Sequence, residues 1–175
     1  MIKILDVNAV SAEEIFARTQ TETDVSGIVS DIIATVRREG DAALKAYAKK
    51  FDGAELKSLL VTPEELDEAV ASVSPKFIEI LKTAAENIRR FHERQVRTSF
   101  ILNDRDGIVT GQKVIPMDRV GLYVPGGTAA YPSTVLMDAI PAKIAGCPEL
   151  VMTTPPNKEG KINPVILAAA KIAGV

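Results

Sequence analysis

The chain contains 175 residues, of which 46% are hydrophobic and 25% are charged, and its formal net charge is -2. These values are typical of an ordinary globular protein, and the nearly balanced charge disfavours a nucleic-acid partner. The single cysteine excludes an internal disulfide, and no apolar segment reaches the roughly 18 residues that a membrane span requires. The amino terminus lacks the basic and apolar regions of a signal peptide, so we expect a cytoplasmic protein with no membrane partner.

The first half of the chain has the pattern of a series of helices. Ser11 and Glu14 have the spacing of a capping box, and Thr62 and Ser74 are each followed by a proline, as at many helix starts. Apolar positions at helical spacing continue through this half, and they predict one long amphipathic helix at its end. We therefore expect helices over residues 12–19, 25–39, 42–51, from 63 onward and over 75–95.

The second half of the chain begins with a β-pattern. Two segments, 98–103 and 107–116, flank the turn sequence Asp104-Arg105-Asp106-Gly107 and predict a β-hairpin. The apolar segment "VGLYV" at 120–124 predicts a strand of a parallel sheet that is buried on both faces.

The order of the remaining elements predicts the fold class. A helix over 132–146, interrupted by Pro141, a second strand over 149–154 and a final helix over 165–174 follow the first parallel strand. This order predicts an α/β fold, in which a helical N-terminal arm precedes the start of an incomplete Rossmann-like parallel βαβα unit. Because two parallel strands leave both edges open, and Gly174 stands where a helix would hand over to another strand, we expect a truncated piece of a longer protein.

Two segments of the second half carry a specific resemblance. "RVGLYVPGGTAAYPSTVLMDAIPAKIAGC" and the following "PELVMTTPP" resemble the first nucleotide-binding segment of the histidinol dehydrogenase family. The earlier segments "VSDIIATVRREGDAALKAYAKKFDG" and "AAENIRRFHERQ" are similar to the N-terminal region of the same family. The resemblance covers essentially the whole chain. It implies an N-terminal arm at 1–20, a helical region ending in the hairpin at 21–118, and the first part of a nucleotide-binding α/β domain at 119–175.

The resemblance implies an oxidoreductase of histidine biosynthesis. Members of this family use NAD and zinc to oxidise L-histidinol through L-histidinal to L-histidine, and they form intertwined homodimers. Their zinc ligands and proton-transferring groups include several histidines, whereas this chain has only His92. We therefore expect neither zinc nor catalytic residues in this chain, and we expect it to be inactive by itself, because a zinc site needs three or four convergent ligands.

The loop Pro125-Gly126-Gly127 is the candidate cofactor site. It joins a strand to a helix, where glycine permits close backbone approach and free N–H groups attract a diphosphate. The residues alone leave open whether it is a plain turn or a phosphate-facing loop, since glycine marks both. The resemblance favours the second interpretation and implies an NAD contact at Tyr123, for which a core tyrosine with a satisfied hydroxyl is the alternative. The expected cofactor-binding residues are Tyr123, Pro125, Gly126 and Gly127.

Several other residues have simpler structural interpretations. Cys147 has apolar neighbours at a helix end, where a cysteine is usually a small buried side chain rather than a nucleophile. The acidic cluster from Glu64 to Glu68 stands at a helix start, where negative charge offsets the backbone dipole. Arg89, Arg90 and Arg94 are typical of a solvated helix face, although such a face can also contact phosphate.

Two further functions stay open. The chain could act without catalysis, as an assembly or dimerisation fragment, since unfilled sheet edges and exposed apolar faces favour association. It could also belong to a paralogous NAD-dependent dehydrogenase of another small alcohol, because the residues that would select the substrate are not among those that carry the resemblance.

Overall fold

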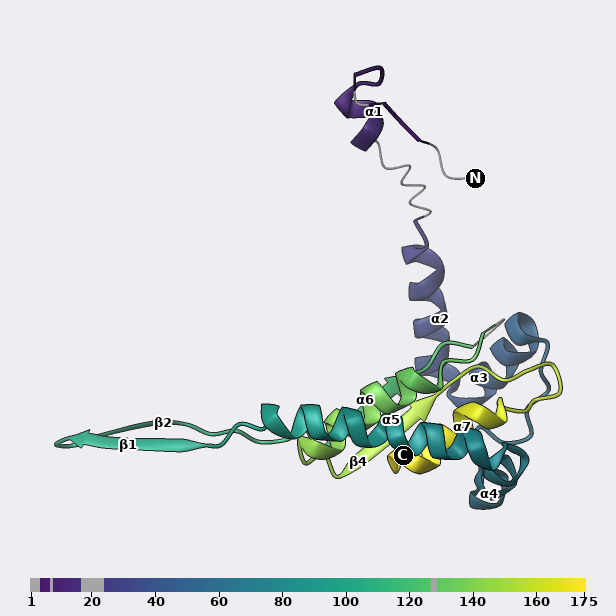
Figure 1. Ribbon diagram of the computed structural model, residues 1–175. Helices are drawn as coiled ribbons and strands as arrows, with labels where there is room; N and C mark the ends of the chain where they lie inside the picture. The colour runs from purple at the N-terminus through teal and green to yellow at the C-terminus, as the bar shows by residue number, and fades with distance from the viewer. Residues whose placement is uncertain (1–3, 7, 17–23, 127–128) are drawn as a thin grey trace. The chain divides into compact units, whose positions relative to one another are not determined.

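The computed structural model describes residues 4–6, 8–16, 24–126 and 129–175 (Figure 1). Its contacts divide the chain into two compact units, residues 1–40 and residues 41–175. The fold is mixed α/β and contains two small sheets, one antiparallel and one parallel. In the described ranges, no helix has the length and apolar character needed to cross a membrane.

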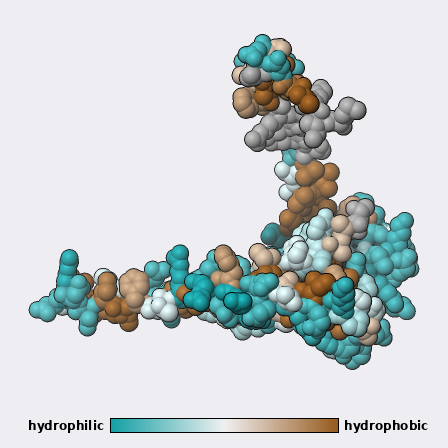
Figure 2. Space-filling view, in the orientation of Figure 1, coloured by the Kyte–Doolittle hydropathy of each residue, from teal (hydrophilic) through white to brown (hydrophobic). Residues whose placement is uncertain are grey.

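The first unit contains helices α1 (Ala12–Phe16) and α2 (Ser26–Glu39). Half of the expected capping box is present, because Ser11 Oγ accepts a 3.2 Å hydrogen bond from the backbone N–H of Glu14. The expected helix over 12–19 extends beyond the described residues after Phe16. No residue of α2, which the structure describes from end to end, is buried, and Ile28, Val29 and Ile33 are exposed apolar side chains on a helix with apolar surface (Figure 2).

The second unit begins with a helix that changes its winding. Helix α3 (Asp41–Tyr47) continues directly into the π-helix η1 (Ala48–Asp52), where the rings of Tyr47 and Phe51 stack with their centroids 5.6 Å apart. Gly53 ends the segment in the left-handed conformation, with φ of 69°. The expected helix over 42–51 is therefore present, but its last part is wider than an α-helix.

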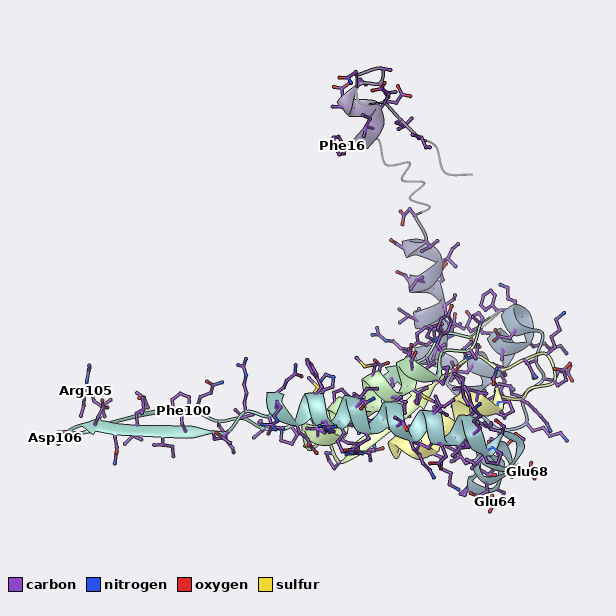
Figure 3. All side chains as sticks on the ribbon, in the orientation of Figure 1. Phe16, Glu64, Glu68, Phe100, Arg105 and Asp106 are labelled. Atoms are coloured by element: carbon purple, nitrogen blue, oxygen red, sulfur yellow. The ribbon has the colours of Figure 1, made fainter. Side chains whose placement is uncertain are left out.

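The next two helices begin where the caps predict. In α4 (Pro63–Ser72), Thr62 and Glu65 form a complete capping box, and in α5 (Pro75–His92) the Ser74 hydroxyl accepts a hydrogen bond from Phe77. The 3₁₀ turn η2 (Glu93–Gln95) extends α5 to the predicted end of the long helix. The side chains of Glu64 and Glu68 stand on α4, as Figure 3 shows, and both are exposed.

The predicted hairpin is present and lies open to solvent. Strands β1 (Phe100–Arg105) and β2 (Ile108–Gln112) pair antiparallel, and the turn contains Gly107 with φ of 73°. Every residue of both strands is exposed (Figure 3), including five large apolar side chains, those of Phe100, Ile101, Leu102, Ile108 and Val109.

The predicted parallel pair is also present. Strand β3 (Arg119–Tyr123) pairs with β4 (Glu149–Thr153), and Arg119 and Glu149 face each other at the start of the register. The guanidinium Nε of Arg119 lies 2.8 Å from a carboxylate oxygen of Glu149. Helix α6 (Pro132–Ile144) connects the two strands, and α7 (Pro164–Ala173) follows β4.

The core of the second unit lies between α5, α6, α7 and one face of the parallel pair. Val124, Val135 and Ala168 are fully buried there. The expectation that "VGLYV" is buried on both faces is wrong. Leu122 and Val124 are buried but Gly121 and Tyr123 are exposed, so only one face of the strand packs against the core.

The expected interruption of the helix at Pro141 is also wrong. Helix α6 continues through this residue to Ile144. A proline removes one backbone N–H donor, but this position lies in the last turn and so disturbs little of the helix. Gly146, with φ of 90°, then turns the chain towards β4, and Cys147 is buried in the core as expected.

Candidate functional site

The carboxyl ends of β3 and β4 form the edge on which the candidate site is built. Tyr123 is the last residue of β3 and pairs with Thr153, and the N–H of Val124 donates a 2.9 Å hydrogen bond to the Thr153 carbonyl. The loops from both strands leave the sheet at this edge, which is where open α/β sheets bind ligands. Two adjacent hollows lie there.

The first hollow contains Tyr123, and we call it the Tyr123 hollow. It has a volume of about 860 Å³, and its apolar lining includes the stacked rings of Tyr47 and Phe51 together with Leu60. The Tyr123 side chain belongs to a residue that is 64% exposed. The interpretation of Tyr123 as a core tyrosine is therefore wrong, and its ring is available to a ligand.

The second hollow contains Pro125 and Gly126, and we call it the Gly126 hollow. It has a volume of about 780 Å³, and the loop from β3 forms one side, with Ala129 and Ala130. The loop from β4 and the start of α7 form the other side. Gly127, the fourth expected cofactor-binding residue, lies outside the described residues.

Gly126 has a clear steric role. A Cβ atom at this position would lie 2.5 Å from Cγ of Pro155, a distance that real Cβ atoms do not show. Glycine is thus required here because the loops from β3 and β4 approach each other closely. This requirement fits the plain-turn interpretation of the loop. It also means that Gly126 and Pro155, which both line the Gly126 hollow, are held close together.

A wall formed by Thr154, Pro155 and Pro156 separates the two hollows, and Asp52, Lys161 and Ile162 also line both. The wall leads into a hydrogen-bonded turn, in which Asn157 Oδ1 accepts a 2.8 Å bond from the N–H of Lys161. A Cβ at Gly160 would lie 3.4 Å from Leu56, so this turn packs against the segment that follows η1. The structure thus brings together two segments that are far apart in the sequence.

Sequence reasoning assigned neither the turn Asn157–Lys161 nor the neighbouring segment Ala48–Asp52 to the candidate site. The turn Asn157–Lys161 could have been found from its asparagine and glycine, which favour turns at these positions. The π-helical segment Ala48–Asp52 leaves no comparable signal, since its residues have an ordinary helical pattern.

One residue that lines the Tyr123 hollow, Glu55, belongs to an ion pair. Lys49 Nζ lies 2.5 Å from a carboxylate oxygen of Glu55, one of the lining residues. The hydrogen bond from Lys49, together with its positive charge, lowers the pKa of Glu55 below its ordinary value. Glu55 is therefore a carboxylate at neutral pH.

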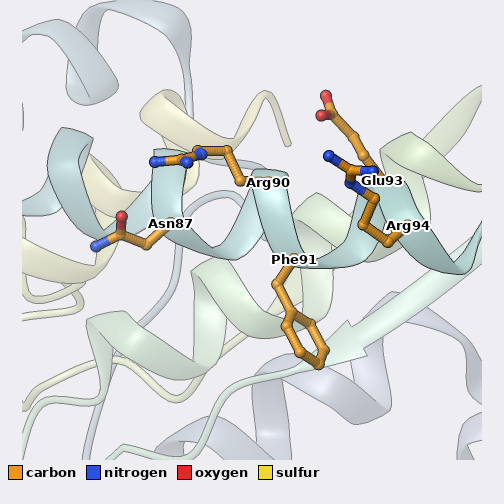
Figure 4. Close-up of a pocket in the computed structure, with 5 residues that line it drawn as sticks. All are labelled: Asn87, Arg90, Phe91, Glu93 and Arg94. Carbon is orange, nitrogen blue, oxygen red and sulfur yellow. The ribbon is translucent and has the colours of Figure 1, made fainter.

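A third, smaller hollow lies on α5 and η2, away from the parallel edge. It has a volume of about 420 Å³ and is lined by Asn87, Arg90, Phe91, Glu93 and Arg94 (Figure 4). All five residues are exposed and come from the last turns of α5 and from η2. This arrangement supports a solvated face. The neighbouring His92 places Nδ1 2.7 Å from Gln95 Oε1, which gives it a structural partner.

The described residues do not fit a metal centre. In the parts of the chain that the structure describes, no three histidine, cysteine, aspartate or glutamate side chains are placed so that they could share a metal ion. Cys147 lies in the core among apolar side chains, where a charged metal ion would be poorly solvated. We assign no zinc ligand to these residues.

Comparisons with known proteins identify the family. The model for the family "Histidinol dehydrogenase" matches residues 16–175. The histidinol dehydrogenase of Geobacillus kaustophilus is 55% identical over 147 residues, which are 84% of this chain and 35% of the relative. That of Clostridium acetobutylicum is 45% identical over 180 residues, which are 100% of this chain and 42% of the relative.

A solved structure agrees with the sequence comparisons. The crystal structure of histidinol dehydrogenase from Elizabethkingia anophelis superimposes with a TM-score of 0.85 at 38% identity, and covers 90% of this chain and 36% of that one. The chain therefore spans well under half the length of the relatives it matches. Since the family model matches nearly all of its residues, the chain belongs to the histidinol dehydrogenase family.

Proposed function

We propose that this chain supplies part of the NAD site of a cytoplasmic histidinol dehydrogenase, which oxidises L-histidinol through L-histidinal to L-histidine. Membership of the family supports the reaction class, and two relatives with this activity in their names match most or all of the chain. The chain spans 35–42% of those relatives, so we assign the complete reaction to a longer protein that contains it, and we propose that the chain alone is inactive.

The observation that carries this proposal is the pair of hollows at the carboxyl edge of β3 and β4. Tyr123 lines one hollow, and Pro125 and Gly126 line the other. A flat ring can pack on the exposed Tyr123 side chain, and a diphosphate can approach the backbone at Gly126. We propose NAD contacts at these three residues and at Gly127, and we propose that residues 119–175 begin a Rossmann-like nucleotide-binding domain.

The residues of this chain would bind and orient NAD, whose nicotinamide ring accepts a hydride when it is bound. The wall between the hollows would hold the cofactor in one direction, because it is stiffened by Pro155 and Pro156. We route no step through zinc, because the described residues do not fit a zinc site.

Calorimetric titration of NAD into this chain tests the proposal. We expect saturable binding that Tyr123→Ala weakens about tenfold, since loss of a stacked aromatic ring typically costs 1–3 kcal/mol. Phe100→Ala is the matched control, because Phe100 is an exposed aromatic residue on the hairpin and lines neither hollow. Equal affinity in the Tyr123→Ala variant would contradict the assignment of the site.

A second function, assembly as a homodimer, is favoured by a separate observation. Strands β1 and β2 expose five large apolar side chains, and a two-stranded hairpin is marginally stable by itself in water. We propose that a second copy of the chain covers this surface in a homodimer. Sedimentation at high concentration would detect the dimer, and Ile101→Lys should weaken it while Asp104→Lys, in the same strand, should not. A monomer at every concentration would refute this role.

A further inference from the structure

The two hollows differ in charge as well as in shape. The Tyr123 hollow is lined by four carboxylates, those of Asp52, Glu55, Glu65 and Glu159, and by two lysines, Lys57 and Lys161. The Gly126 hollow is lined by one carboxylate, Asp52, and by two lysines, Lys158 and Lys161. Because Lys49 pairs with Glu55, the three remaining carboxylates face two lysines in the first hollow, whereas one carboxylate faces two lysines in the second. An anionic group is therefore favoured in the second hollow over the first.

Lys161 has a special position in this arrangement. It is the one basic residue among the described residues that lines both hollows. Within residues 24–126 and 129–175, no carboxylate lies within ion-pair distance of Lys161 or Lys158. Their ammonium groups are therefore free to bind a ligand anion.

The backbone around Lys161 is fixed by contacts that do not use its side chain. Its N–H donates to Asn157 Oδ1, and its carbonyl accepts a 2.8 Å hydrogen bond from the N–H of Asn157. The turn also packs on Leu56, as the close approach of Gly160 shows. A substitution at Lys161 should therefore change the charge of the site without unfolding the turn.

We infer that Lys161, assisted by Lys158, binds the diphosphate of the dinucleotide in the Gly126 hollow, and that an end of the cofactor without phosphate lies in the Tyr123 hollow. This inference rests on the proposed function, because it assumes that the two hollows hold NAD. It adds to that function which part of NAD lies on each side of the wall formed by Thr154, Pro155 and Pro156. The excess of carboxylates over lysines disfavours the diphosphate in the Tyr123 hollow, and it favours the positively charged nicotinamide ring of oxidised NAD over a neutral ring.

The test uses inorganic pyrophosphate and NAD as separate calorimetric probes of this chain. Lys161→Met should weaken both ligands about tenfold, because it removes a charge-assisted hydrogen bond to the diphosphate. Tyr123→Ala should weaken NAD alone. Lys161→Arg should restore most of the affinity for both, and Lys113→Met, an exposed lysine outside both hollows, is the charge-matched control.

Asp52 provides a test of opposite sign. Its half-buried carboxylate lines both hollows, so Asp52→Asn should strengthen pyrophosphate binding by about threefold, which is the size expected when one solvent-screened like charge is removed. A weaker affinity after this substitution would contradict the placement of the diphosphate.

The outcomes separate the inference from the function on which it rests. If Tyr123→Ala weakens NAD and Lys161→Met leaves it within twofold, the function stands and the diphosphate assignment is wrong. If the unaltered chain binds no NAD, or binds it equally in all variants, the proposed function fails and the inference fails with it. Parallel losses of NAD and pyrophosphate in Lys161→Met, with normal pyrophosphate binding in Tyr123→Ala, would support both.

Discussion

The packed α/β part and the β1–β2 hairpin both contain large apolar residues, but only the α/β part buries them. In the α/β part, Val124 and Val135 are fully buried between helices and strands. In the hairpin, Ile101 is 75% exposed and Val109 is 72% exposed. The two regions belong to the same compact unit, so apolar residues by themselves do not indicate which segments form the core.

The contrast shows which interactions hold each region together. The hairpin is formed by local pairing across the Asp106-Gly107 turn, and its strands contact mainly each other. The α/β part is formed by contacts between segments that are distant in the sequence, such as α5 with α6 and α4 with α7. We therefore expect substitutions in the α/β part to change the stability of the whole unit, and substitutions in the hairpin to act locally.

The largest effect is expected from Leu136→Ala. Leu136 is 1% exposed on α6, and removing its side chain should cost about 2–5 kcal/mol of unfolding free energy, because it leaves a cavity in the core. Leu102→Ala in the hairpin makes the same chemical change at a half-exposed position and should cost less than about 0.5 kcal/mol. Urea unfolding measures both, and equal losses would remove the distinction between the two regions.

A smaller effect is expected from Gly126→Ala at the candidate site. The new Cβ would lie 2.5 Å from Pro155, and separating the two loops should cost about 1–3 kcal/mol. Gly121→Ala, in the same strand and loop segment, meets no atom within 4 Å and is the matched control. Thermal unfolding would compare them. If Gly126→Ala is as stable as the control, the loops separate freely and the wall between the hollows is not rigid.

The capping box at α4 should contribute about 1 kcal/mol. Thr62 Oγ1 accepts a hydrogen bond from Glu65, whose carboxylate accepts one from the N–H of Thr62. Thr62→Ala removes the first bond and should lower the unfolding free energy by about 1 kcal/mol. Thr110→Ala, at an exposed hairpin position, should change it by only a few tenths of that value. If only Thr110→Ala lowered the unfolding free energy, the expectation that the capping box contributes more than the hairpin position would be wrong.

The smallest effect is expected at the exposed Lys49–Glu55 ion pair. Its hydrogen bond lowers the pKa of Glu55 in the folded state below the unfolded value of 4.5. The contribution to stability is therefore present above pH 4.5 and is lost as the pH falls through the folded pKa. The melting temperature of Glu55→Gln should lie slightly below that of the unaltered chain at pH 7, and the difference should vanish at low pH. A difference that grows on acidification would contradict the pairing.

Local signals in the sequence predicted much of the fold. Thr62 and Ser74 marked two helix starts, and the turn before Ile108 marked the hairpin, because caps and turns depend on neighbouring residues. The parallel pairing of β3 and β4 followed from the strand-helix-strand order. Two expectations failed at Pro141 and at the second face of β3, since helix continuity and burial depend on what packs nearby.

The candidate site was predictable only in part. Pro125 and Gly126 stood out because they follow a predicted strand, and the family resemblance implied Tyr123. Lys161 and Asp52 did not, because nothing in their neighbouring residues shows that they line the same hollows. The charge difference between the hollows arises from the meeting of distant segments, and it becomes visible only when these are placed together.

The ion pair at the start of the parallel strands bears on which side chain is exposed at their carboxyl ends. Arg119 and Glu149 are both exposed, so their attraction adds little to stability, but it marks one alignment of the strands. Successive side chains of a strand point to opposite faces, so a slip of β3 by one residue would turn Leu122 towards water and Tyr123 towards the core. A contact at one end of the sheet thereby favours the alignment that exposes the Tyr123 ring at the other.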